Sequence, residues 1–146
     1  MKKILRLALK NGAFSELSKK RSEIMRSVKA NGNKTTERRL RAALIRSGIK
    51  GWKVNPKSTL GNPDFFFPAQ RIAVFVDGCF WHACARCGHV PNNNRSFWSL
   101  KLVNNRKRDR QVNRQLRAQG IKVIRLWEHQ LNGELQTSVK RIASNL

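Results

Sequence analysis

All three cysteines of the chain lie in one short segment, residues 79–87, which reads Cys-Phe-Trp-His-Ala-Cys-Ala-Arg-Cys. An odd number of cysteines does not suit a closed disulfide framework. The spacing C-x4-C-x2-C instead suits thiolate ligands of a metal ion in a reducing compartment. We therefore predict a metal-binding loop, and a fold that brings any further ligand to it.

A structural zinc ion takes four ligands from thiolates and imidazoles, and Cys79, Cys84 and Cys87 supply three of them. The chain has three histidines that are candidates for the remaining ligand: His82, His89 and His129. Spacing alone does not choose among them. His82 also has a second interpretation, as a group that transfers protons in a catalytic site.

The chain carries 31 Lys and Arg residues against 8 Asp and Glu, a net charge of +23 on 146 residues. Such a field attracts polyanions and binds phosphates through counterion release, so we expect a nucleic-acid partner. Hydrophobic residues make up 40% of the sequence, which is enough for one compact domain. An apolar run near the N-terminus is interrupted by Arg6 and lacks a cleavage site. No stretch reaches the roughly 18 residues that span a bilayer, and we expect a cytoplasmic protein with no membrane partner.

Residues 1–33 form a basic segment that ends in the turn signal Asn-Gly-Asn at 31–33. We divide the chain there into an N-terminal arm, 1–33, and a single domain, 34–146. The segment Arg21–Val28 of the arm has two interpretations. It is either a solvated tail or a short helix with one apolar side and with arginines that face phosphates.

The domain alternates between helical and strand patterns. The expected elements are a helix at 35–48, strands at 52–55, 64–67 and 71–77, a long basic helix at 96–119 and a strand at 121–127. Thr35 and Ser96 are the expected caps of the two helices. This order of elements predicts an α/β layered fold.

A site that cleaves phosphodiesters needs a divalent ion, held by carboxylates and backbone oxygens, and a base that takes a proton. Asp64 starts a strand behind Pro63 and is the leading candidate for a metal ligand. Asp77 ends the neighbouring strand, so two carboxylates are expected close together at the edge of one sheet. Glu37 is either a residue that favours the start of its helix or a further carboxylate directed at this site.

Aromatic residues flank the cysteine loop and open the long helix: Phe80, Trp81, Phe97 and Trp98. In basic surroundings such side chains stack on bases or wedge between them, whereas elsewhere they fill cores. The surface position expected for a metal loop favours the first interpretation for Phe80 and Trp81.

Several of these motifs occur together in one family. The chain resembles the very-short-patch repair mismatch endonucleases, a branch of the PD-(D/E)xK nuclease superfamily, over about residues 21–131. The resemblance rests on Arg-Ser-x-x-Met-Arg at 21–26, Thr-Glu-Arg-Arg-Leu at 36–40, Leu-Gly-Asn-Pro-Asp-Phe at 60–65, Phe-Val-Asp-Gly-Cys-Phe-Trp-His at 75–82, Ser-Phe-Trp at 96–98, Asn-x-x-Arg-Asp at 105–109 and Leu-Trp-Glu-His at 126–129.

The resemblance implies a restriction-endonuclease-like core: a central mixed β-sheet flanked by helices, with a structural zinc site and a basic N-terminal arm. It implies an enzyme that nicks one DNA strand 5′ to the thymine of a T·G mismatch. Asp64 would bind Mg²⁺ together with the backbone carbonyl of Val76. His82 would act in proton transfer, and Glu37 would support the site. Asp77 joins these catalytic candidates but replaces a histidine of the family, and its carboxylate would either bind a second metal or alter the phosphate contacts.

The resemblance also implies ligands and contacts outside the catalytic set. Structural Zn²⁺ would be held by Cys79, Cys84, Cys87 and His129. Cys84 and His129 exchange thiolate and imidazole relative to the family pattern, and Cys87 is shifted by one residue. The residues implied to contact DNA are Arg21, Arg26, Phe80, Trp81, Trp98, Lys101, Asn105 and Arg108.

The expected partner is double-stranded, mismatched DNA, bound by a monomer in the nucleoid region of a bacterial cytoplasm, with mismatch-repair proteins as possible further partners. Two other hypotheses fit parts of the sequence. The same nuclease core can serve another DNA-processing role without mismatch specificity, because mismatch choice depends on the wedge and loop residues. A non-catalytic zinc module that binds nucleic acid would explain the charge and the cysteines, but not Asp64 and His82.

Overall fold

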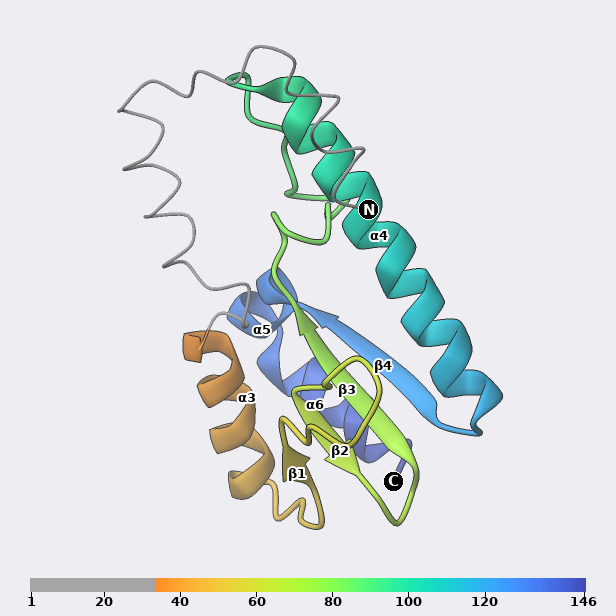
Figure 1. The fold of residues 1–146 in the computed structure, drawn as a ribbon. Helices are drawn as coiled ribbons and strands as arrows, with labels where there is room; N and C mark the ends of the chain where they lie inside the picture. The colour runs from red at the N-terminus through yellow and green to blue at the C-terminus, as the bar shows by residue number, and fades with distance from the viewer. Residues whose placement is uncertain (1–33) are drawn as a thin grey trace. The chain divides into compact units, whose positions relative to one another are not determined.

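The computed structural model describes residues 34–146, so the predictions for the arm, including Arg21 and Arg26, lie outside the described residues. The helices are α3 (Lys34–Arg46), α4 (Arg95–Ala118), α5 (Glu128–Gly133) and α6 (Leu135–Ala143). The strands are β1 (Lys53–Val54), β2 (Phe65–Phe67), β3 (Ile72–Asp77) and β4 (Lys122–Trp127). Figure 1 shows their arrangement. No helix within 34–146 is long and apolar enough to cross a membrane.

The strands form one four-stranded sheet in the order β1-β2-β3-β4. The pairs β1–β2 and β2–β3 are antiparallel, whereas β3 and β4 are parallel and pair from Ile72↔Lys122 to Asp77↔Trp127. A parallel pair needs a crossover connection, and here it contains the cysteine loop and α4. Every residue of β3 is buried, as expected for a strand covered on both faces. The mixed α/β fold predicted from the sequence is thus confirmed.

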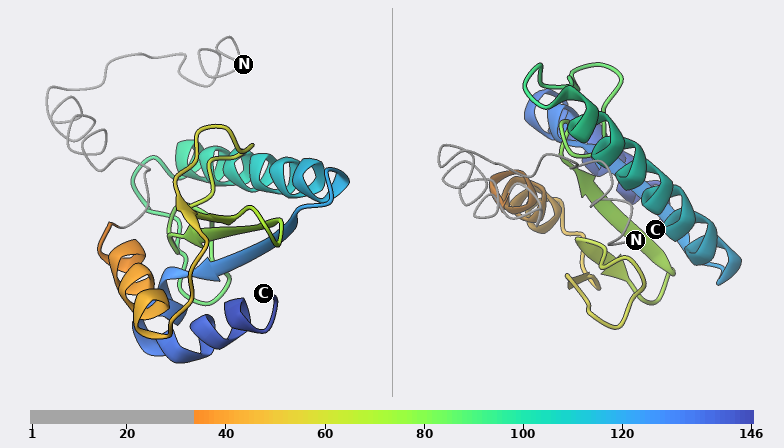
Figure 2. Two further views of the ribbon diagram at one scale, coloured as in Figure 1. Left: turned by 90° about the horizontal axis from the view of Figure 1, so that it is seen from below. Right: turned by 45° about the horizontal axis from the view of Figure 1, so that its top comes forward.

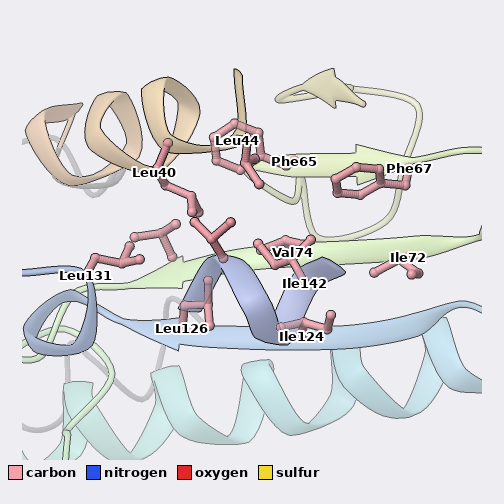
Figure 3. Close-up of a cluster of buried hydrophobic side chains, with 13 residues drawn as sticks. Leu40, Leu44, Phe65, Phe67, Ile72, Val74, Ile124, Leu126, Leu131 and Ile142 are labelled. Atoms are coloured by element: carbon pink, nitrogen blue, oxygen red, sulfur yellow. The ribbon is translucent and has the colours of Figure 1, made fainter. Parts of the chain in front are cut away.

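Helices cover both faces of the sheet, as Figure 2 shows with α4 on one side and α3, α5 and α6 on the other. Side chains alternate along a strand, so neighbouring residues of β3 face opposite layers. Ala73 and Phe75 pack with Leu116 of α4. Val74 and Val76 face the larger cluster, which Figure 3 shows between the sheet and the other helices.

The predicted helix caps are wrong. α3 already includes Lys34, so Thr35 lies within its first turn. α4 begins at Arg95, and its cap is Asn94, a left-handed residue with φ 55° and no side-chain capping bond. Asparagine tolerates this conformation better than most residues, which explains why the chain turns into the helix before Ser96.

The C-terminal helices α5 and α6 were not predicted. Their signal was present in the sequence, because Leu135, Val139 and Ile142 recur at helical spacing. Val139 and Ile142 are buried against α3 and the sheet. The C-terminus therefore completes the larger hydrophobic core and holds α3 in place.

Candidate functional site

Asp64 lies immediately before β2, where the chain enters the sheet behind the buried Pro63. Its Oδ2 accepts a hydrogen bond from the backbone N–H of Val76, at 2.6 Å. The loop before it packs closely on α4 and β3. Gly61 has φ 80°, and a Cβ there would collide with a methyl group of Val112, so only glycine fits.

The structure places Glu37 of α3 beside Asp64. Burial raises the pKa of Asp64 to about 7. The hydrogen bond from Val76 acts to lower this pKa, whereas the charge of Glu37 and, more weakly, that of Asp77 act to raise it. Two neighbouring carboxylates in a partly buried position repel each other when both are ionised. A divalent cation bound between them would remove that repulsion.

Asp77 and His82 belong to a second group that includes two residues not predicted from the sequence, Asp109 of α4 and Arg125 of β4. Nδ1 of His82 donates to Oδ2 of Asp109 at 2.6 Å. Its Nε2 is 3.8 Å from Oδ1 of Asp77. Among residues 34–146, the ionic partners of His82 are therefore Asp77 and Asp109, and not Asp64.

The Arg125 guanidinium connects the two carboxylates of this group. Its terminal nitrogens lie 3.3 and 3.4 Å from the two oxygens of Asp109, and Nε lies 3.5 Å from Oδ2 of Asp77. The guanidinium is stacked over the ring of Phe75, 4.7 Å from its centroid. One cation thus connects the middle of α4 to the end of β3 through their acids.

The two aspartates of this group respond differently to their surroundings. Burial raises the pKa of Asp77 despite the opposing charges of Arg125 and His82. Burial also acts to raise the pKa of Asp109, but the hydrogen bond from His82 and the charge of Arg125 outweigh it and hold that pKa below its usual value. Asp109 is therefore the stronger anionic partner of the histidine.

Cys79, Cys84, Cys87 and His129 come together as one four-ligand cluster, with all ligand atoms within 4.8 Å of one another. The three sulfurs lie 3.2, 3.7 and 3.4 Å from Nδ1 of His129. A tetrahedral zinc ion, with Zn–S of about 2.3 Å and Zn–N of about 2.0–2.1 Å, would place each sulfur about 3.5 Å from the nitrogen. The residues therefore fit a zinc ion.

Backbone hydrogen bonds shape the cysteine loop. The N–H of Cys84 donates to the carbonyl of Cys79 at 2.9 Å, and that of Gly88 donates to the carbonyl of Cys84 at 2.8 Å. Glu128 accepts a bond from the N–H of Cys79, which joins the loop to α5. The three thiols also interact with one another. Hydrogen bonding to Cys79 raises the pKa of Cys87, and burial and the neighbouring Cys84 raise it further, to about 12.

The predicted aromatic residues form one cluster beside this loop. Phe80 lies 5.1 Å from Trp81 and 5.3 Å from Trp98, measured between ring centroids. The amino group of Lys101 lies 5.3, 5.7 and 5.5 Å from the ring centroids of Trp81, Phe97 and Trp98. These half-buried rings are held by edge contacts and leave part of their surface exposed.

The other predicted DNA contacts within 34–146 lie on α4. The side-chain amide of Asn105 donates to the carbonyl of Trp81 at 3.0 Å, so it also fixes the aromatic part of the loop. Arg108 is exposed and contributes to the low pKa of Asp109 through its charge.

Comparison with known proteins identifies the family. The model of the DNA mismatch endonuclease Vsr family matches residues 16–87. The type II nicking enzyme V.NaeI of Lentzea aerocolonigenes is 40% identical over 131 residues, covering 86% of this chain and 76% of the relative. The DNA mismatch endonuclease Vsr of Escherichia coli is 32% identical over 128 residues, covering 86% and 80%.

The chain belongs to the Vsr family. It is therefore a DNA endonuclease, and the resemblance seen in its motifs is confirmed. The family match ends at Cys87, but the alignment with the nicking enzyme of Xanthomonas oryzae pv. oryzae, 32% identical, covers 84% of this chain and 91% of that relative. Homology to Vsr-type enzymes thus extends over most of the chain.

Proposed function

We propose that this Vsr-family protein is a Mg²⁺-dependent endonuclease that nicks one strand of double-stranded DNA 5′ to the thymine of a T·G mismatch. The observation that carries the proposal is the pairing of Asp64, bonded to the Val76 N–H, with Glu37 at one end of the sheet. A restriction-endonuclease-like core, with its cutting site at the ends of the central strands β2 and β3, is the fold we assign to this arrangement.

The Mg²⁺ ligands of this chain would be the carboxylate of Asp64 and the backbone carbonyl of Val76, with Glu37 beside them. Oxygen ligands of this kind suit a hard divalent cation. When bound, such an ion neutralises phosphate charge and makes water more acidic.

His82 is the group we assign to proton transfer. Donation from Nδ1 to Asp109 fixes the tautomer in which Nε2 carries a lone pair, so Nε2 can accept a proton. The nearby Asp77 would stabilise the imidazolium that results. We assign Asp77 this role instead of second-metal binding, because its two oxygens already face Arg125 and His82.

The zinc ion that we place at Cys79, Cys84, Cys87 and His129 would be structural. It closes a loop between residues 42 positions apart, Cys87 and His129, and so fixes α5 to the segment that carries His82 and the aromatic cluster. A closed set of protein ligands, with no open position, is typical of structural zinc.

The aromatic cluster is the proposed DNA wedge. Phe80, Trp81 and Trp98 present ring surface beside the cation of Lys101. Wedge residues of this type enter a base step and are aided there by a mismatch, which lowers the cost of unstacking. We further propose that the protein acts as a monomer in the bacterial cytoplasm, in contact with the nucleoid and with mismatch-repair proteins.

A second candidate function is strand nicking without mismatch specificity, in another DNA-processing role. It is favoured by the fact that several relatives carry the name type II nicking enzyme. Both functions use the same cutting residues and differ in what the wedge and loops select.

The test uses zinc-loaded protein, Mg²⁺ and a labelled duplex with one T·G pair. The parent protein should nick the thymine strand, and Asp64→Ala should abolish nicking while it keeps one zinc per chain. An unchanged rate in Asp64→Ala would refute the assigned cutting site.

A further inference from the structure

An open cavity of about 170 Å³ is lined by residues of α4 on one side and of the sheet and the cysteine loop on the other. Arg106, Asp109, Arg110 and Asn113 line it from α4, where their spacing of three and four residues places them on one face. The opposite wall consists of Asp77, His82, Arg125 and Trp127. Asp64 and Glu37 are not among the lining residues, whereas Asp77 and His82 are, so the cavity adjoins the proposed cutting site and shares two of its residues.

The acids of this cavity already have partners. Asp109 is bonded to His82 and Arg125, and Asp77 faces the same two residues. Arg106 and Arg110, in contrast, form no ion pair with any residue of 34–146. Three guanidinium groups and two carboxylates line the cavity, so its charge is positive even before His82 is counted.

Two unpaired guanidinium groups one helical turn apart suit a single tetrahedral anion. Guanidinium binds phosphate oxygens through two parallel hydrogen bonds, and arginine is the preferred residue for this geometry. The lining is largely ionic, with Trp127 its only aromatic member apart from His82, so it suits an anionic group better than a nucleobase.

We propose that this cavity binds one phosphate of the DNA backbone, held by Arg106 and Arg110. Asp64 and Glu37 do not line the cavity, whereas His82, the group assigned to proton transfer, does. We therefore place this phosphate directly beside the one that is cut. Contacts to phosphates position a protein on the duplex without reading its sequence. Arg125 lies on the opposite wall, and its ion pairs with Asp77 and Asp109 would keep these two acids from pairing with Arg106 and Arg110 in place of the phosphate. The inference rests on the proposed DNA substrate but not on mismatch specificity.

The first experiment measures affinity for a fully paired duplex without Mg²⁺, so that it is independent of cleavage. The variant Arg106→Gln/Arg110→Gln is compared with Arg114→Gln/Arg117→Gln, which removes the same charge from exposed positions of α4 that do not line the cavity. Affinity should fall about tenfold more in the first variant, because it loses charge-assisted hydrogen bonds to one phosphate, whereas the second variant loses only positive charge near the DNA. Equal losses in the two variants would overturn the proposal. Zinc content and circular dichroism check that both variants fold.

The second experiment replaces single phosphates of a T·G duplex with neutral methylphosphonates, one position at a time. In the parent, replacing one particular phosphate near the nick should lower the affinity about tenfold. In Arg106→Gln/Arg110→Gln, replacing that same phosphate should leave the affinity unchanged, whereas the other positions should behave as in the parent. If this variant shows the same profile as the parent, the arginines contact no particular phosphate and the proposal is wrong. The parent protein could also show such a position, lost in the double variant, but fail to nick the duplex. That result would refute the proposed catalysis and would still support the phosphate site.

Discussion

Asp64→Asn should stabilise the protein in the absence of Mg²⁺, although it should also abolish nicking. The carboxyl of Asp64 is partly buried beside Glu37, and this environment raises its pKa from 3.8 to about 7. The folded state therefore keeps this proton to higher pH than the unfolded state does. The contribution of protonated Asp64 to the free energy of unfolding is fully present below about pH 4. It is lost as the pH rises through about 7, because the ionised carboxylate is disfavoured in the folded state.

The size of the effect follows from the shift. One pKa unit corresponds to about 1.4 kcal/mol, so a rise from 3.8 to about 7 removes up to about 4 kcal/mol of unfolding free energy above pH 7. Asparagine has no charge to bury, and its carbonyl can still accept the hydrogen bond from Val76. The stability gained by Asp64→Asn should thus be close to zero at pH 4 and should grow toward about 4 kcal/mol at pH 8.

Urea unfolding of the zinc-loaded proteins at several pH values measures this difference. The groups that titrate in both proteins contribute equally and largely cancel. Mg²⁺ added at pH 8 should stabilise the parent, whose ionised Asp64 binds it, and should leave Asp64→Asn unchanged. Parallel stability curves for the two proteins across pH 4–8 would refute the reasoning, because they would mean that the Asp64 carboxyl has the same pKa in the folded and unfolded states.

Three further predictions address the zinc site, the histidine and the wedge. Cys84→Ala should lose zinc and cooperative thermal unfolding, because structural zinc binding is coupled to folding; full zinc content with an unchanged Tm would contradict this. Asp109→Asn should lower the single-turnover nicking rate by about 10²-fold or more at unchanged DNA affinity, because His82 loses its anionic partner; a rate equal to that of the parent would show that His82 does not depend on it. Trp81→Ala should weaken binding to a T·G duplex by about 1–3 kcal/mol in fluorescence anisotropy, and more than binding to a paired duplex; equal losses would exclude a wedge.

Local patterns in the sequence were sufficient for much of the fold. β3 is an apolar run that ends at Asp77, and Asp64 lies directly before the start of β2. The cysteines are close in sequence and were certain to be close in space. The choice of His129 as fourth ligand came from the family resemblance, because spacing within the loop says nothing about a residue 42 positions beyond Cys87.

Arg125 and Asp109 could not be assigned from local pattern. Arg125 lies in an alternating strand, where a charged residue normally faces solvent, and only the packing of α4 over β4 encloses it. Asp109 lies within a run of basic residues, where an acid looks like a surface ion-pair partner. Their roles depend on the contact between two elements, and no single segment contains that information.

The most direct test of the account is strand-specific nicking of matched duplexes. Zinc-loaded protein with Mg²⁺ is incubated with a duplex that carries one T·G pair and with the same duplex carrying T·A or C·G, each strand labelled separately. We expect a single nick 5′ to the mismatched thymine, with little cutting of the paired duplexes or of the guanine strand. Equal nicking of paired and mismatched duplexes would contradict the mismatch assignment, and no nicking of any duplex would contradict the cutting site built on Asp64 and His82.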